Sequence, residues 1–270
     1  MKIHIVKPTY HFELLENLFY TSLKDLGHSF TPLEDADLII AIRSGNRKEL
    51  NIGNEQKFAL LQTEAYKVSP HQKEDLKKYG PYPFSRCNAD VYWGFDKSDE
   101  NETYLIIGYH PSLDFTSKGF VAEKYPLGFI GCTTQRRNAV FSKSKFPVRS
   151  CNTWDILGGI HMSKECKINI HMNAWDKREA LTPWDRITRY LHNKCFFIMA
   201  DIDYCPINPA VICNIQDLKS TADKYINNDK LRHDIAEECY TIYKRDFDMR
   251  NILQKKIEEL YQLNHYPNRF

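Results

Sequence analysis

The segment "LTPWDRITRYLHNKCFFIM", residues 181–199, joins a helix directly to a buried strand. Thr182 is a good N-cap, Pro183 suits the first helical position, and Asp185 stands where a carboxylate can close a capping box. The apolar run at 194–200 that follows is typical of a buried strand. A helix followed at once by such a strand favours an α/β fold with a parallel sheet.

Two arginines one turn apart distinguish this helix. Helical spacing directs Arg186 and Arg189 away from the core, and it directs four residues inward: Trp184, Ile187, Thr188 and Leu191. In open α/β sheets, ligands bind at helix N-termini beyond the ends of the strands. We therefore expect the arginines to meet an anion there.

Strand and helix patterns alternate along the rest of the chain. Apolar, strand-like runs occupy residues 2–6, 36–42, 57–64, 90–95, 127–131, 166–172, 194–200 and 210–214. Helical spacing occurs at 11–27, about 217–228 and 229–263. The alternation restarts after a polar stretch, so we predict two Rossmann-like lobes, residues 1–118 and 119–270, hinged near 111–126.

Composition excludes several classes of protein. The 37 Lys and Arg residues nearly balance 35 Asp and Glu, so the net charge of +2 gives no general attraction to polyanions. The eight cysteines lack the spacing of a zinc site or a disulfide framework. Neither a signal peptide nor an apolar run of membrane-spanning length is recognisable, so we expect a soluble, cytoplasmic protein.

A second candidate anion site lies at "LGFIGCTTQRRNAVF", residues 127–141. A strand ending at Gly131 leads through Thr133 into a helix that opens with Arg136 and Arg137. Backbone N–H groups, a hydroxyl and guanidinium groups together suit a phosphate. Neither a GxGxxG nor a P-loop motif is present, so the segment is not a dinucleotide-binding fingerprint.

Two other features have ordinary interpretations. Asp201 and Asp203 follow an apolar strand in the pattern of a metal-binding pair, but they come late in the chain, and we favour a strand-end turn. The histidines have no shared spacing, which is typical of hydrogen-bonded core residues. We therefore expect no bound metal.

Four segments in order resemble the second lobe of GT-B glycosyltransferases: "LIIGYHPSLD" (105–114), "GFIGCTTQRR" (128–137), residues 163–203, and "AVICNIQDLK" with the two helices after it (210–240). The sequence is most similar to the CgeB-like branch and, more distantly, to phage DNA β-glucosyltransferases. The resemblance implies a nucleotide-sugar donor in the second lobe. The implied donor contacts are Gly131, Thr133, Arg136, Arg137, Asn169, His171, Asp185, Arg186 and Arg189.

The sequence differs from the family pattern at one donor-binding position. Arg189 stands where the family has a glutamate that holds the ribose. Two alternatives follow: Asp185 or Glu179 takes over the ribose contact, or Arg189 simply adds charge to the phosphate site.

In the first lobe, "FALLQTEAYKVSP" (58–70) is similar to the strand-end segment that carries the catalytic aspartate of phage DNA glucosyltransferases. The resemblance puts Glu64 in that place, where a carboxylate can take the proton from an acceptor hydroxyl. The alternative is an ordinary surface carboxylate in a loop. The implied acceptor contacts at neighbouring strand ends are Tyr10, His11, Arg43 and Arg47.

The expectation is a metal-independent glycosyltransferase with the GT-B fold. Its acceptor hydroxyl belongs to a glycan, to a small molecule or to a hydroxymethylated base of DNA. The alternative is a catalytically inactive module that binds a nucleotide-sugar or a glycan. A metal-dependent enzyme using Asp201 and Asp203 is a further alternative, which activity in the presence of a chelator excludes.

Overall fold

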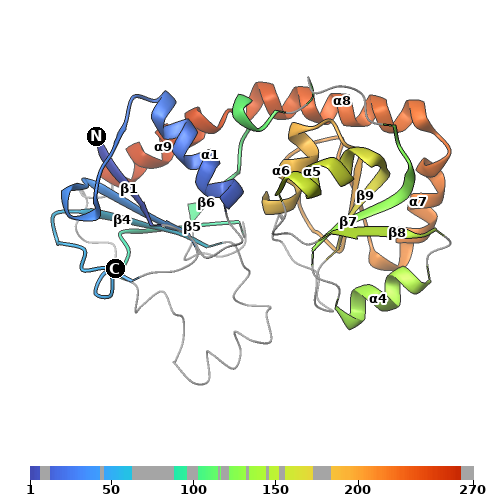
Figure 1. Cartoon of the computed structure of the whole chain (residues 1–270), viewed down its shortest axis with the longest axis horizontal. Coiled ribbons are helices and arrows are strands. Elements are labelled where there is room, and N and C mark those ends of the chain that lie inside the picture. Colours follow the sequence, from blue (N-terminus) through green and yellow to red (C-terminus); the bar gives the residue numbers. More distant parts are fainter. Residues whose placement is uncertain are drawn as a thin grey trace. The chain divides into compact units, whose positions relative to one another are not determined.

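The computed structural model describes residues 1–6, 13–42, 46–62, 88–95, 103–114, 116, 122–131, 134–143, 146–151, 156–172 and 184–262. Figure 1 shows two α/β units, each with its own sheet. Unit 1 comprises Met1–His110 and Phe247–Phe270, and unit 2 comprises Pro111–Asp246. The prediction of two Rossmann-like lobes is therefore confirmed.

Unit 1 contains a six-stranded parallel sheet in the order β2-β1-β3-β4-β5-β6. Its strands are β1 (Lys2–Val6), β2 (Ser29–Phe30), β3 (Leu38–Ile42), β4 (Lys57–Gln62), β5 (Val91–Gly94) and β6 (Thr103–Tyr104). Every residue of β3 is buried, as expected for a central strand covered on both faces. The strands predicted from the apolar runs of this region are all present.

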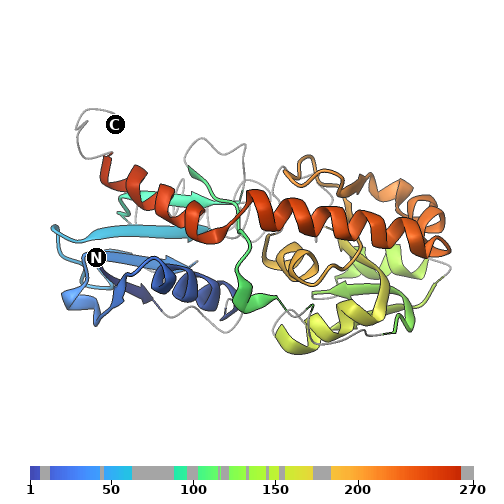
Figure 2. The same cartoon turned by 90° about the horizontal axis from the view of Figure 1, so that it is seen from above.

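Helix α1 (Glu13–Asp25) lies beside this sheet and packs against α9 (Met249–Gln262). The predicted helix at 11–27 is confirmed over residues 13–25, and the chain leaves it through Gly27, whose φ of +79° suits a residue without a Cβ. Figure 2 shows α9 lying along the sheet of unit 1. The C-terminal helix thus completes the layer that α1 begins.

Unit 2 contains a five-stranded parallel sheet in the order β11-β10-β9-β7-β8. Its strands are β7 (Tyr125–Ile130), β8 (Val148–Cys151), β9 (Cys166–Met172), β10 (Phe197–Ala200) and β11 (Val211–Cys213). The second strand in sequence lies at the edge, beside the first, and the third lies on the other side of the first. The strand order therefore reverses between β7 and β9, and in such sheets ligands bind beyond the carboxyl ends at this point.

Among the described residues, five helices lie around this sheet: α4 (Gln135–Ser142), α5 (Ile156–Glu165), α6 (Trp184–His192), α7 (Leu218–Ile226) and α8 (Asp229–Asp246). Side chains of α4 and α7 join the core cluster around Leu127, Phe129 and Ile170. Gly159 of α5 lies over Ile130, whose side chain points to the opposite face because strand side chains alternate. Helix α5 in turn packs against α6, so the sheet is covered on both faces.

The single helix predicted for residues 229–263 is wrong, because the structure has two helices with a break at Phe247 and Asp248. At the break, Tyr109 N donates to Phe247 O at 2.6 Å, and Met249 N donates to Tyr109 O at 2.9 Å. These bonds attach the start of the last helix, at Met249, to unit 1. The division therefore falls after His110 and again after Asp246, unlike the predicted boundary at 118 with a second lobe running to residue 270.

Gly108 allows this close approach of the two crossing segments. A Cβ at residue 108 would collide with the carbonyl oxygen of Phe247 and lie 2.9 Å from Met249 N. We expect Gly108→Ala to lower the free energy of unfolding by about 1–3 kcal/mol, as overpacking does. Urea denaturation measures the loss. Gly53→Ala is the control, since the nearest atom to its Cβ would be Gln56 Oε1 at 3.5 Å, and an equal effect of both changes would contradict the steric explanation.

Candidate functional site

Gly131 follows β7 at the carboxyl edge of the unit 2 sheet. Its N–H donates to Cys151 O at 2.9 Å, which joins the ends of β7 and β8. Its φ is +144°, and a Cβ there would lie 3.1 Å from the ring of Phe129 and 3.6 Å from Cζ of Arg186. The positive φ and the close Phe129 ring therefore favour a glycine here, and the Arg186 guanidinium lies at van der Waals distance from the end of β7.

Arg137 lies at the same edge, in the first turn of α4. Its backbone N–H donates to Thr134 Oγ1 at 3.3 Å, so Thr134 caps the helix. Its side chain is 4% exposed, lies over the ring of Phe129 at 5.0 Å and donates through Nη2 to Met172 O at 3.0 Å. This guanidinium therefore links the N-terminus of α4 to the end of β9.

Arg186 of α6 approaches from the other face of the sheet. Its Nη1 lies 3.1 Å from His171 Nδ1, and it is half-buried. An arginine has no acceptor, so this contact requires Nδ1 of His171 to accept and the imidazole to be neutral. Gly131, Arg137, His171 and Arg186 therefore form one cluster at the point where the strand order reverses. We call these four residues the arginine cluster.

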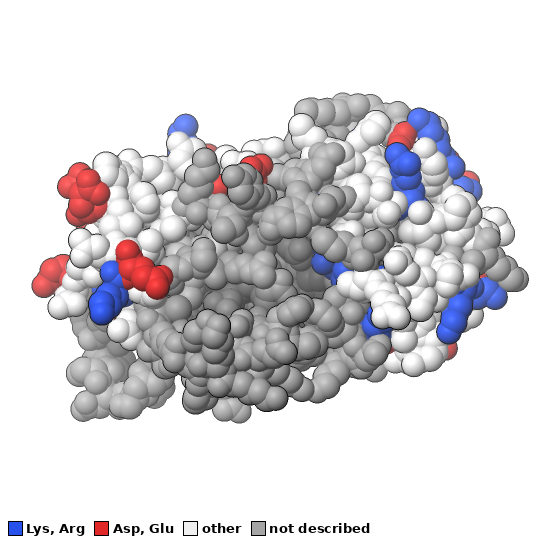
Figure 3. Space-filling model, turned by 60° about the horizontal axis from the view of Figure 1, so that its bottom comes forward, with Lys and Arg blue, Asp and Glu red and all other residues white. Residues whose placement is uncertain are grey.

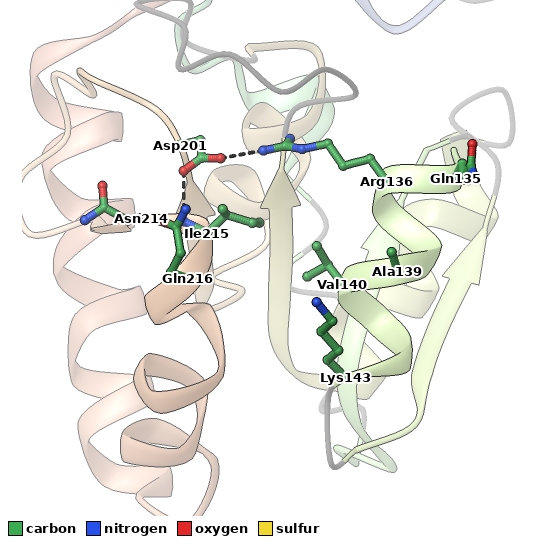
Figure 4. Close-up of a pocket in the computed structure, with 9 residues that line it drawn as sticks. All are labelled: Gln135, Arg136, Ala139, Val140, Lys143, Asp201, Asn214, Ile215 and Gln216. Carbon is green, nitrogen blue, oxygen red and sulfur yellow. Dashed lines mark hydrogen bonds and ion pairs between the residues drawn. The ribbon is translucent and has the colours of Figure 1, made fainter.

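Arg136 lies beside this cluster but has a carboxylate partner. Its Nη2 is 2.6 Å from Asp201 Oδ2, and Asp201 Oδ1 accepts from Ile215 N at 2.8 Å. Figure 4 shows Arg136 extending from α4 to Asp201 across one end of a pocket of about 810 Å³. Asp201, with φ of +58°, makes the strand-end turn that the sequence favoured. Sequence spacing gave no signal for this ion pair, which joins residues 65 positions apart.

Two further predicted donor contacts, Asn169 and Arg189, are buried. Asn169 is fully buried in the middle of β9, and its Nδ2 donates to Ser163 O at 3.0 Å and Phe196 O at 3.2 Å. Arg189 is only 3% exposed, so its predicted solvent-facing position is wrong. Its Nη1 would lie 2.9 Å from a Cβ at Gly159, which means that the glycine of α5 makes room for the guanidinium.

The predicted acceptor contact at Arg47 is also corrected. Its side chain donates to Gly53 O at 2.7 Å and pairs with Asp90 Oδ2 at 2.6 Å. Both partners precede strands, Gly53 before β4 and Asp90 before β5. Arg47 therefore joins turns at the amino edge of the sheet, opposite the edge where parallel α/β sheets bind ligands.

The other predicted residues lie outside the described part of the chain: Tyr10, His11, Arg43, Glu64, Thr133 and Glu179, with the side chain of Asp185. In sequence, the first four follow the carboxyl ends of β1, β3 and β4. Their chain positions thus agree with the edge that the prediction requires, and their contacts stay predictions.

Two buried cysteines of unit 2 are not activated nucleophiles. Six of the described cysteines are free thiols, and burial raises the pKa of both Cys166 and Cys195 to about 12. These two thiols are therefore protonated at neutral pH and pack as apolar groups. No group of three or more potential metal ligands occurs in the described ranges. None of the described helices has the length and apolar character needed to cross a membrane.

No protein-family model matches this sequence, and no curated protein sequence matches it either. Solved structures are similar. An α-glucosyltransferase in complex with UDP and a 13-mer DNA containing a HMU base has a TM-score of 0.64 and 11% identity, covering 97% of this chain and 99% of that one. The DNA-modifying enzyme β-glucosyltransferase has a TM-score of 0.61 and 9% identity, covering 97% and 100%.

A third similar structure is an α1,3-fucosyltransferase with GDP-fucose, at a TM-score of 0.56 and 13% identity over 100% of this chain and 91% of that one. Identities this low identify a shared fold. The chain has the two-lobe GT-B fold of these glycosyltransferases, as the resemblance implied.

Proposed function

We propose that the protein transfers a sugar from a nucleoside diphosphate sugar to an acceptor hydroxyl, with the donor bound by unit 2. The observation that carries the proposal is the arginine cluster. Arg137 and Arg186 converge from two helices on the carboxyl edge of the sheet, beside Gly131. Guanidinium groups bind phosphate oxygens through charge-assisted hydrogen bonds, and a diphosphate supplies several such oxygens.

The same groups account for the chemistry. As the bond from the sugar to the diphosphate breaks, negative charge grows on the leaving oxygen. Fixed guanidinium groups and helix N-termini stabilise that charge more strongly in the transition state than in the bound donor. The reaction then needs no metal ion, and full activity in a chelator supports this part of the proposal.

The direct test is a thermal-shift screen of UDP-sugars and GDP-sugars, followed by measurement of nucleoside diphosphate release with candidate acceptors. A donor that stabilises the protein and is turned over supports the proposal. No stabilisation by any nucleotide-sugar, or full binding after loss of both Arg137 and Arg186, contradicts it.

Two classes of acceptor are compatible with this proposal. A DNA-bound α-glucosyltransferase and a DNA-modifying β-glucosyltransferase share the fold, which favours a hydroxymethylated base. On the face in Figure 3, however, the described Lys and Arg side chains stand in small separate groups, with Asp and Glu among them. A glycan or small-molecule acceptor is therefore tested alongside DNA. Turnover is compared on a hydroxymethylated oligonucleotide, the unmodified oligonucleotide and free glycans.

A second candidate function is a module that binds a nucleotide-sugar without turning it over. The burial of Arg189, where the family resemblance has a ribose-binding glutamate, favours it. Stabilisation by UDP or GDP without hydrolysis or transfer identifies this case.

We further propose that the protein is a CgeB-like enzyme, from the order of its motifs, and that it is cytoplasmic, from its free cysteines.

Arg186→Ala is expected to weaken UDP or GDP binding about tenfold to 100-fold, because a charge-assisted hydrogen bond contributes about 1.5–3 kcal/mol. Isothermal titration calorimetry measures the change. Arg149→Ala is the matched control, since that exposed arginine of the same unit lies over the ring of Tyr125 at 5.4 Å. Equal affinity of the Arg186 variant and the parent would remove Arg186 from the donor site.

A further inference from the structure

A pocket of about 460 Å³ lies between α4 and α7, over one face of the unit 2 sheet. Leu127 of β7 and Ile170 of β9 form its floor. It shares no residue with the arginine cluster, whose Arg186 belongs to α6. Its volume falls in the range of roughly 300–1,000 Å³ that small-molecule sites occupy.

The sequence of α4 explains why the two helices leave this space. In the eight residues QRRNAVFS, Arg137 is the only buried one, so the helix has no continuous apolar face to close against α7. Phe141, at its end, is held edge-on to Phe129 at 5.2 Å between ring centroids. Phe141 and Phe146 both line the pocket and are only half-buried, so aromatic surface remains open at its wall.

The rim of the pocket is positively charged. Lys143 and Lys219 line it, both are exposed, and neither forms an ion pair with any residue that the structure describes. None of the residues lining this pocket is acidic. Other lysines of unit 2 do have carboxylate partners: Lys124 with Glu165, Lys167 with Asp229, Lys194 with Glu237 and Lys230 with Asp234. The two rim lysines thus differ from these in having no such neighbour in the described part of the chain.

We propose that this pocket binds a small molecule with an apolar body and one anionic group. The body displaces water from the half-buried side chains of Val140, Phe141 and Phe146, which drives binding. The anionic group meets Lys143 and Lys219 at the rim, and these charges select an anion over a neutral molecule of the same shape. A fatty acid and an aromatic acid share this chemistry.

The probe for the test is 8-anilinonaphthalene-1-sulfonate, an apolar monoanion that becomes fluorescent in apolar surroundings. Its neutral counterpart is N-phenyl-1-naphthylamine, which has the same rings without the sulfonate. We expect the sulfonate to bind at one site and at least tenfold more tightly than the amine. Saturating UDP should leave its affinity unchanged, which separates this pocket from the proposed donor site.

Two variants locate the site. The exposed pair Lys143→Glu with Lys219→Glu should weaken sulfonate binding at least tenfold and leave amine binding unchanged, and Val140→Trp should fill the pocket and abolish both. Lys255→Glu, an exposed lysine of α9, is the charge control and should have no effect. Displacement by decanoate alone or by 2-naphthoate alone distinguishes a fatty acid from an aromatic acid.

Three results would overturn the proposal. The first is a sulfonate affinity that survives both the double lysine change and the tryptophan substitution. The second is equal affinity for the anionic and neutral probes, which would remove the preference for an anion. The third is displacement by neither acid. If UDP competes with the probe while the variants have no effect, the probe reports the donor site, and the pocket proposal fails without affecting the proposed function.

Discussion

Replacing Glu64 by glutamine is expected to slow sugar transfer by about 10²–10⁴-fold, the usual contribution of a general base. Glu64 comes two residues after Gln62, the last residue of β4. That strand lies inside the unit 1 sheet, between β3 and β5, and ligands bind beyond the carboxyl ends of such strands. Glutamine keeps the size and polarity of the side chain but cannot take a proton from the acceptor hydroxyl.

The measurement is single-turnover transfer at saturating donor, together with the affinity for UDP or GDP. We expect the affinity to be unchanged, because the proposed donor contacts belong to unit 2. Glu55→Gln is the matched control, since this exposed carboxylate precedes the amino end of the same strand. A Glu64→Gln enzyme with the full transfer rate would exclude Glu64 as the base, and would leave retention of configuration as the open mechanism.

Arg232→Met is expected to lower the free energy of unfolding of unit 2 by about 2–4 kcal/mol, because two backbone carbonyl groups and the mostly buried Glu123 lose their donor. Arg232 is fully buried. Its Nη1 donates to Tyr225 O at 2.8 Å and Ile226 O at 2.9 Å, the last two carbonyl groups of α7. Its Nη2 bonds Glu123 at 2.5 Å and Asp229 at 2.7 Å. Methionine fills the space but satisfies none of these acceptors.

Urea denaturation measures this loss without screening the charges. Lys230→Met in the same helix is the control, because its ion pair with Asp234 is exposed and such pairs contribute about 0–1 kcal/mol. The hydrogen bond from Arg232 lowers the pKa of Asp229. Its contribution is therefore present at neutral pH and is lost as the pH falls through that lowered pKa. A loss no larger than that of the control would mean that the cluster around Arg232 is not important for stability.

The buried strands were predictable because their signal is local, whereas β2, β6 and β8, which contain no buried residue, were missed. Buried parallel strands such as β3 and β10 are apolar runs, and those runs appear directly in the sequence. The break between α8 and α9 has no such signal. Its cause is Tyr109, whose backbone pairs with Phe247 more than a hundred residues later. Helix α5 was also missed, since the adjacent glycines Gly158 and Gly159 weaken a helical pattern.

In the candidate site, too, the sequence predicts the positions of some residues and not of others. Gly131 and Arg137 were predictable, because a residue directly after a parallel strand, or in the first turn of the next helix, must lie at the carboxyl edge. The position of Arg189 depends on α5, and that of Arg47 depends on Asp90, 43 residues away. Such distant partners decide whether an arginine is free to meet a ligand, and helical spacing alone does not contain that information.

The return of α9 to unit 1 determines the order in which the chain can fold during its synthesis. Unit 2 is one continuous segment, 111–246, so all of its strands exist before α9 has been made. Unit 1 begins first but keeps the apolar face of α1 partly uncovered until Met249, Leu253, Ile257 and Leu260 have been added. Since domains generally fold as units, unit 1 can complete its fold only after α9 has been made, whereas unit 2 needs no segment beyond residue 246.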